Sequence, residues 1–476
     1  PECQRVASPR ADHPSAPGVT LVVGPFAAGA LNYTQSDLTF YCDLTREEII
    51  RRQTSGGLRN LGDDRDLSPG EKYKIGYYVE WPLLEDYKRF LLREVDRPVD
   101  FYVDANDDDK PAILPRELLL EAVADVSSRP FRCKPFFMPG VWGGQRMKEV
   151  AQLPAEYANS AWDFEIVAPE NGIILGIGGE RITIPFHLLM WFRAQPILGD
   201  LAYRYFGEYF PIRFDYLDTM QGTNLSLQVH PHHSYIRQHF NEPFAQDESY
   251  YIVENEPGAK VYLGLKEGMT RERLWEAVHR AETEFVPFDI AEYVNAWDAQ
   301  PGDLFLIPSG TVHCSGANNL VLEISSTPYW YTFKIYDYLR PDLNGKPRPI
   351  NSAHGFEVID FTRTTRWVRQ HLIPSPILLR QDDGGAEYHL GSHFMTFYGI
   401  NRLHIQDSLA DDTGDSFYVI TVVKGDGVRI LSDAHAAEPI EVAYLETYVI
   451  PAAFGRFHLQ RIGNQECQVV KAYVKR

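Results

Sequence analysis

Cysteine is scarce in this chain of 476 residues, and basic side chains are outnumbered by acidic ones. Its five cysteines are scattered without a CxxC pair, so neither a disulfide framework nor a cysteine-rich zinc site is expected. The net charge of −19 argues against nucleic acid and anionic membranes as partners. No apolar run reaches the roughly 18 residues of a membrane span, and residues 1–18 lack the apolar core of a secretory signal. We therefore expect a cytoplasmic protein.

Composition predicts several folded domains. Hydrophobic residues make up 44% of the chain, enough to bury sizeable cores. Changes of pattern predict four segments: a disordered tail at 1–18, a small α/β module of unclear role at 19–128, and strand-rich domains at 129–345 and 346–476. Two helical stretches, at about 185–206 and 271–282, interrupt the third segment. Many short strands separated by Gly and Pro turns are typical of β-sandwiches and barrels.

The α/β module carries local signals but no recognisable site. Thr45 and Glu48 have the spacing of a capping box and predict a helix that runs through Arg52. The stretch DLTFYCDLTREEIIRRQ (37–53) loosely resembles the C-terminal half of a P-loop nucleoside or sugar kinase. The chain has no G-x4-GK[ST] loop, so it cannot hold a triphosphate in that way. We interpret the module as a docking or lid element.

Two strand-rich stretches repeat each other in outline. PGDLFLIPSGTVH (301–313) and LETYVIPAAFGRFHL (445–459) both run from an acidic residue through an apolar strand to Ile-Pro, Gly and His. The second copy has no upstream partner resembling the QVH of residues 228–230. The sequence therefore predicts two barrels, of which only the first keeps a polar site.

Four polar residues of the first repeat suit a metal. In LSLQVHP (225–231), Leu225, Leu227 and Val229 alternate with the polar residues, so Gln228 and His230 share one face of a strand. Glu248 lies on the next strand-like run, and His313 ends the repeat. Two imidazoles, a carboxylate and an amide oxygen suit a divalent first-row metal.

These segments resemble a known family. The spacing of Gly302, Pro308, Gly310 and His313 resembles the second cupin motif. QVHP, followed by Glu248 and EPGAKVYLGLKEG (256–268), resembles type I mannose-6-phosphate isomerase. So do KPFFMPGVWGGQRMKE (134–149), AWDFEI (161–166) and YDYLRPDLNGKPRP (336–349). The resemblance covers about residues 134–476. It implies a mainly β fold of two cupin (jelly-roll) β-barrels with a helical insertion, beside the N-terminal α/β module.

The resemblance also implies an activity and its residues. Type I mannose-6-phosphate isomerases are zinc-dependent aldose–ketose isomerases of carbohydrate metabolism, which convert mannose 6-phosphate to fructose 6-phosphate. The implied ligands of one Zn²⁺, or of another divalent first-row metal, are Gln228, His230, Glu248 and His313. Candidates for proton transfer are Lys334 and Glu323, and candidates for substrate binding are Arg213, Arg237 and Gln246. The implied partner is a small sugar or sugar phosphate, and a homodimer is left open.

The chain departs from the family where positive charge is expected. Gln246 stands where the family has a Lys just before the ligand Glu, and Asp215 stands where it has a second Lys, with Arg213 two residues away. Lys334 replaces an Arg, and the two are not equivalent in binding phosphate. Two alternatives therefore stay open: an isomerase of an unphosphorylated sugar, or a non-catalytic sugar-binding or regulatory cupin.

Overall fold

The chain forms two compact units. The computed structural model describes residues 4–6, 21–30, 36–94, 99–326, 331–342, 345, 348–433 and 438–476. One unit comprises residues 1–124 and 174–192, and the other residues 125–173 and 193–476. The predicted tail at 1–18 lies outside the described residues, except for the short strand β1 (Gln4–Val6). No helix of the described residues combines the length and the apolar character needed to cross a bilayer.

The first unit contains the expected α/β module. Its three-stranded sheet has the order β3 (Phe40–Asp43), β4 (Phe101–Asp104) and β5 (Ala112–Pro115), with β3 parallel to β4 and β5 antiparallel to it. The other elements of this unit are β2 (Leu21–Val23), α1 (Ala27–Ala30), α2 (Arg46–Thr54), α3 (Pro69–Ile75), η1 (Gly76–Glu80), α4 (Trp81–Arg89), η2 (Phe90–Glu94) and β9 (Glu180–Pro185). Three elements straddle the division between the units: α5 (Arg116–Val126), β8 (Gly172–Ile177) and α7 (Phe186–Leu198).

The predicted capping box is wrong. Helix α2 begins after Thr45, as expected, but Thr45 makes no side-chain bond to the helix. Its hydroxyl instead donates to Asn106 Oδ1 at 2.9 Å, and Glu48 accepts from Arg51 and Arg52 one turn further along. The hydroxyl that the sequence pattern assigns to the helix N-terminus is therefore bound by Asn106, 61 residues away and just beyond β4.

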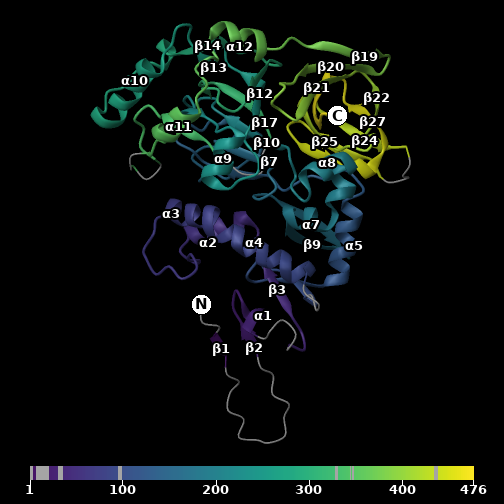
Figure 1. Ribbon diagram of the computed structural model, residues 1–476. Helices are drawn as coiled ribbons and strands as arrows, with labels where there is room; N and C mark the ends of the chain where they lie inside the picture. The colour runs from purple at the N-terminus through teal and green to yellow at the C-terminus, as the bar shows by residue number, and fades with distance from the viewer. Residues whose placement is uncertain are drawn as a thin grey trace, which may run out of the picture. The chain divides into compact units, whose positions relative to one another are not determined.

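The second unit consists of two antiparallel barrels with the same strand order. The first pairs a six-stranded sheet, β15-β12-β17-β10-β7-β6, with a five-stranded sheet, β14-β13-β16-β11-β18; the second pairs β26-β23-β28-β21-β20-β19 with β25-β24-β27-β22. Strand for strand, the orders correspond, and within the described part of the chain β18 is the one barrel strand without a counterpart. Figure 1 shows the second barrel in yellow-green beside the first. The predicted mainly β fold of two jelly-roll barrels is confirmed.

The barrel strands are short. Those of the first barrel are β6 (Phe136–Met138), β7 (Trp162–Ile166), β10 (Arg213–Asp218), β11 (Leu227–Val229), β12 (Glu248–Asn255), β13 (Lys260–Leu265), β14 (Val294–Asp298), β15 (Leu304–Ile307), β16 (His313–Ser315), β17 (Asn319–Ser325) and β18 (Phe333–Tyr336). Those of the second are β19 (Ile377–Asp382), β20 (Gly385–Gly391), β21 (Tyr398–Ile405), β22 (Ser408–Asp412), β23 (Tyr418–Lys424), β24 (Gly427–Ser432), β25 (Ile440–Ala443), β26 (Thr447–Ile450), β27 (Arg456–Ile462) and β28 (Cys467–Val474).

Helices connect and cover these strands. The predicted helix at 185–206 is interrupted twice: α7 (Phe186–Leu198) is kinked at Arg193, which has a φ of −138° and a ψ of 25°, and Gly199, with a φ of 80°, separates α7 from α8 (Asp200–Phe206). The predicted helix at 271–282 is α10 (Arg271–Glu284). The remaining helices of this unit are α6 (Arg146–Val150), α9 (His233–Phe240), η3 (Ile290–Glu292), α11 (Ser352–Val358), α12 (Thr365–His371) and η4 (Ala452–Phe454).

Buried hydrogen bonds join the two barrels. Tyr398, on β21 of the second barrel, donates its hydroxyl to Ile324 O of the first barrel at 2.8 Å. In the other direction, Tyr216 on β10 donates to Leu445 O at 3.1 Å. Both tyrosines are almost fully buried. The pairs make the outer face of the first barrel's large sheet a buried interface, where uncompensated polar groups are costly.

One acid on that face lacks a full set of partners. Asp163 on β7 is paired in register with Tyr216, is 1% exposed, and its Oδ1 has no hydrogen-bond partner. Burial raises the pKa of Asp163 well above its usual value, and Glu165 raises it further. When the pKa of a carboxyl is higher in the folded than in the unfolded chain, the free energy of unfolding falls as the pH rises above the unfolded pKa. Ionisation of Asp163 therefore opposes folding at neutral pH.

Asp163→Asn should therefore stabilise the fold more at high pH than at low pH. The amide keeps the shape of the carboxyl but cannot ionise. We expect the difference in free energy of unfolding between variant and wild type to grow by at least about 1.4 kcal/mol from pH 5 to pH 8. Urea unfolding at both pH values measures it, with Asp383→Asn at an exposed position as the control. A difference that is constant with pH would contradict the assignment.

Candidate metal centre

Strand register brings three of the predicted residues into one row of the small sheet. Gln228 on β11 is paired directly with His313 on β16 and, on its other side, with Lys334 on β18. Directly paired residues of antiparallel strands point to the same face. Because Gln228 Nε2 lies 3.2 Å from His313 Nε2 inside the barrel, all three side chains belong to the inner face.

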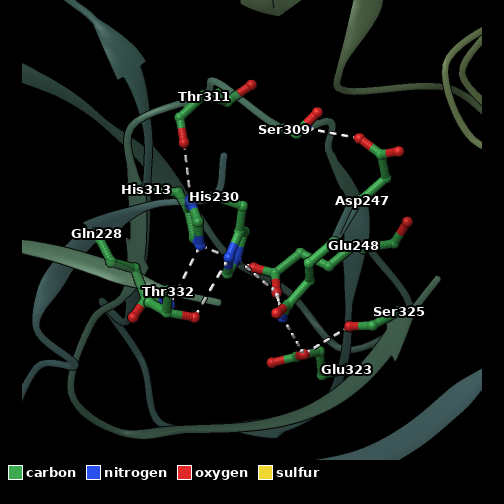
Figure 2. A network of polar contacts seen from close by, with 12 residues as sticks. Gln228, His230, Asp247, Glu248, Ser309, Thr311, His313, Glu323, Ser325 and Thr332 are labelled. Atoms are coloured by element: carbon green, nitrogen blue, oxygen red, sulfur yellow. Dashed lines mark hydrogen bonds and ion pairs between the residues drawn. The ribbon is translucent and has the colours of Figure 1, made fainter. Parts of the chain in front are cut away.

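His230, Glu248 and His313 converge from the two sheets. Glu248 Oε2 lies 3.0 Å from His230 Nε2, and Glu248 Oε1 lies 2.7 Å from His313 Nε2. Figure 2 shows the two rings and the carboxylate pointing toward one another. The three side chains are at most 1% exposed, and their ligand atoms all lie within 4.8 Å of each other. This is the donor set that the sequence predicts for a divalent metal.

The outer nitrogens of both rings have protein partners. His313 Nδ1 lies 2.8 Å from Thr311 O, and His230 Nδ1 lies 3.3 Å from both Tyr331 O and Thr332 Oγ1. A backbone carbonyl can only accept, so each Nδ1 carries the proton and each neutral ring turns the lone pair of Nε2 inward. Two lone pairs therefore face a carboxylate, and a positive charge is needed among them.

A divalent ion fits that requirement. The contacts of His230 Nε2 and Glu248 Oε1 are close but lack hydrogen-bond geometry, so both buried atoms are without a hydrogen-bond partner. Burial alone would raise the pKa of Glu248, but the positive charge of His230 and His313 in their protonated form outweighs burial and holds that pKa well below its usual value. A divalent ion would supply this positive charge when both rings are neutral. The carboxylate is thus an anion at neutral pH, as a metal ligand must be. Gln228 adds a neutral oxygen after a half-turn of its amide, which exchanges the positions of O and N.

The loop before His313 is held from both sides. The backbone N–H of Ser309 donates to Asp247 Oδ1 at 2.7 Å, and that of Gly310 donates to His230 O at 2.8 Å. Gly310 has a φ of 89°, which favours glycine, and so explains the Gly of the motif. From the side of the second barrel, Arg363 donates to Pro308 O at 2.7 Å and to Thr311 Oγ1. Arg363 thus holds the residue whose carbonyl orients His313.

A second polar group lies on the facing sheet. Arg213 donates through Nε to Asp215 Oδ1 at 3.1 Å and through Nη2 to Glu323 and to Ser325 Oγ. Gln246 donates to Glu248 Oε2 at 3.0 Å and to Glu323 Oε1 at 3.4 Å, and so links the two groups. Burial raises the pKa of Asp215 to about 6, although Arg213 opposes it. Burial, Asp215 and Glu248 together raise the pKa of Glu323 well above its usual value.

The structure therefore gathers most of the predicted site residues. Gln228, His230, Gln246, Glu248, His313, Glu323 and Arg213 form one contact network, and Lys334 joins the row of Gln228. Arg237, predicted to bind substrate, is exposed on α9, and its role stays a prediction. Sequence reasoning did not assign roles to Thr311, Asp247 or Arg363, because no spacing in the chain signals contacts that form between distant segments.

Comparison with known proteins agrees with this geometry. Mannose-6-phosphate isomerase ManA of Bacillus subtilis is 26% identical over 345 residues, which cover 72% of this chain and 99% of ManA. Mannose-6-phosphate isomerase of Streptococcus mutans is 23% identical over 60% of this chain and 82% of its own. The resemblance to type I mannose-6-phosphate isomerase is confirmed.

Solved structures support the same fold. The mannose 6-phosphate isomerase of Bacillus subtilis superposes with a TM-score of 0.59 at 18% identity, over 73% of this chain and all of that one. A phosphomannose isomerase variant from Salmonella typhimurium gives 0.55 at 12% identity, also over 73% of this chain and all of its own. Residues 2–128 match a different family, described as a domain of unknown function, DUF8485. The chain thus joins that domain to a fold of the mannose-6-phosphate isomerase type.

The second barrel of this mannose-6-phosphate isomerase-like fold has lost the site's pattern. In the first barrel, Glu248 pairs with Ile307, which precedes Pro308. At the equivalent position of the second barrel, Tyr418 pairs with Ile450, which precedes Pro451. His458 follows the second Ile-Pro but lies between Phe457 and Leu459, which are buried in the apolar core. Successive strand residues alternate faces, so His458 points out of the barrel and contacts Asp433 at 3.2 Å.

Proposed function

We propose that the first barrel is a metal-dependent aldose–ketose isomerase site. The observation that carries the proposal is the convergence of His230 Nε2, His313 Nε2 and both oxygens of Glu248 in a buried interior. The similarity to enzymes named mannose-6-phosphate isomerase supports the reaction class. Zinc is the first candidate ion, held by these three residues and Gln228, since imidazole and carboxylate ligands suit it.

When bound, the ion supplies Lewis-acid polarisation of the sugar oxygens at C1 and C2, where negative charge develops during isomerisation. The chain's own residues handle the protons. One proton leaves C2 and returns at C1, and one leaves the C2 hydroxyl for the C1 oxygen, so no oxidant or second substrate is needed. Two groups lie beside the three metal-binding side chains and suit these proton transfers: Glu323 on the large sheet and Lys334 on the small sheet.

Glu323 is the better-positioned of the two. It is 4% exposed and held by Arg213, Ser325 and Gln246, so its carboxyl is fixed against the metal cluster. Burial, Asp215 and Glu248 raise the pKa of this carboxyl well above its usual value, which favours the protonated form that a general acid requires. Lys334 is half-buried and faces the cluster from the opposite side, in register with Gln228.

Removing the metal should abolish isomerisation reversibly. Protein dialysed against a chelator is expected to lose ketose formation from aldose hexoses, and one equivalent of zinc per chain should restore it. The measurement is ketose production by NMR for the chelated, restored and untreated samples, each with its metal content determined. Isomerisation that persists in protein free of metal would overturn the proposal.

A further inference from the structure

The charge inside the first barrel identifies the class of sugar that it takes. Resting on the isomerase function proposed above, we infer that the substrate is an unphosphorylated aldose rather than a sugar phosphate. The relatives are named for a phosphorylated sugar, so this inference separates the present chain from them.

Two nitrogens of the buried guanidinium of the site are directed at the protein's own acids. Arg213 is 4% exposed, and its Nε and Nη2 are directed at Asp215, Glu323 and Ser325. Two carboxylates thus share one guanidinium. Phosphate recognition in a buried site relies on charge-assisted bonds from cations with donors to spare.

Among the described residues named for this site, acids outnumber cations. Asp215, Glu248 and Glu323 are acids, whereas Arg213 and Lys334 are the cations that lie beside them. Gln246, between Glu248 and Glu323, is a neutral amide and adds no positive charge. Lys334 adds one charge from the small sheet, about half of what a phosphate monoester carries at neutral pH. Burying a dianion without compensating charge is strongly unfavourable.

Two buried groups without partners favour hydroxyls in particular. Gln246 Oε1 and Tyr250 Oη are both buried and have no hydrogen-bond partner. Tyr250 is paired in register with Glu323, on the inner face of the large sheet, and its ring stands edge-on to His313. Gln246 Oε1 can only accept. A sugar hydroxyl can donate to it, whereas the oxygens of a phosphate dianion cannot. The two atoms therefore suit sugar hydroxyls, which a sugar and its phosphate both carry, and the acids beside them disfavour the phosphate.

The test compares one sugar with and without its phosphate. With zinc-loaded full-length protein, kcat/KM for D-mannose is expected to exceed that for D-mannose 6-phosphate by at least tenfold. Gln246→Lys adds a cation between the two glutamates and should shift this ratio toward the phosphate by about tenfold or more. Gln465→Lys makes the same charge change on the exposed surface of the second barrel and should leave the ratio unchanged.

Three results decide between failure of this inference and failure of the isomerase proposal. A wild-type preference for mannose 6-phosphate would overturn the inference and leave the isomerase standing. If neither sugar turns over, calorimetric titration of the zinc-loaded protein replaces kinetics: binding of mannose but not of its phosphate supports the inference without the isomerase. Tighter binding of the phosphate, or no binding of either sugar, overturns it. If Gln246→Lys does not bind one zinc, Asp215→Asn replaces it as the test variant. This change removes an acid from the site and is expected to shift the ratio of kcat/KM values toward mannose 6-phosphate.

Discussion

Glu248→Gln is expected to remove tight binding of a divalent metal, and sugar isomerisation with it. Glu248 is fully buried, and its two oxygens face the inward nitrogens of His230 and His313. The glutamine side chain has nearly the same size but no charge, and it turns an N–H donor toward the place of the ion. Loss of residues that only support metal ligands weakens binding by about 10–100-fold, so loss of the ligand itself should exceed about 100-fold.

Competition with a chelating dye measures the zinc affinity of this variant. Glu323→Gln is a matched control, because it makes the same chemical change inside the same barrel. Glu323 lies on the strand next to Glu248, two residues from Ser325, the residue that pairs with Glu248. We expect Glu323→Gln to bind zinc within about tenfold of wild type, although it should lose isomerase activity. Wild-type zinc affinity in Glu248→Gln would refute the assignment of the centre. Equal loss in both variants would mean that the effect is not specific to the ligand.

Arg363→Met should weaken zinc binding by about 10–100-fold, although Arg363 lies 50 residues from His313 in the sequence. Its guanidinium donates to Pro308 O and Thr311 Oγ1, pairs with Asp360 at 3.2 Å, and is only 6% exposed. Methionine keeps part of the apolar stem but removes the charged donor, so that Pro308 O keeps only its bonds from Thr311 and Thr311 Oγ1 loses the guanidinium. We therefore also expect a loss of about 2–4 kcal/mol in the free energy of unfolding.

A readout at the metal separates positioning from a general loss of stability. If Arg363 orients the loop that carries His313, the visible absorption of cobalt-substituted protein should change in the variant, since that spectrum reports ligand geometry. Arg366→Met, three residues further on at an exposed position, is the control and should leave both spectrum and affinity unchanged. A less stable Arg363→Met protein with unchanged zinc affinity and cobalt spectrum would show that the residue has a structural role only.

Three of the four predicted metal ligands were predictable from local sequence patterns. Alternation in residues 225–230 places Gln228 and His230 on one face, and the Ile-Pro-x-Gly spacing places His313 at the start of a strand. The repeat between 301–313 and 445–459 likewise predicts two barrels, and the strand orders of the two barrels correspond. A pattern of period two is informative here because alternate residues of a strand face the barrel interior and the opposite side of the sheet.

Features that depend on distant pairing were not predictable. Nothing near Arg363 indicates that it holds Thr311, and nothing near Asp215 indicates that it shares Arg213 with Glu323. The capping box at Thr45 failed for the same reason, because Asn106 captures its hydroxyl. By contrast, Asp337 and Arg340, three residues apart, form an ion pair at 2.6 Å. Short-range pairs are fixed by the backbone, whereas long-range partners are chosen by the fold.

Anomalous diffraction from crystals grown with zinc tests the central claim most directly. The account predicts one strong anomalous peak per chain inside the first barrel, within about 2.0–2.2 Å of His230 Nε2, His313 Nε2 and an oxygen of Glu248. It also predicts no such peak among the strands that form the interior of the second barrel. A zinc-soaked crystal without a peak between His230, Glu248 and His313, or with its strongest peak on other residues, would contradict the account.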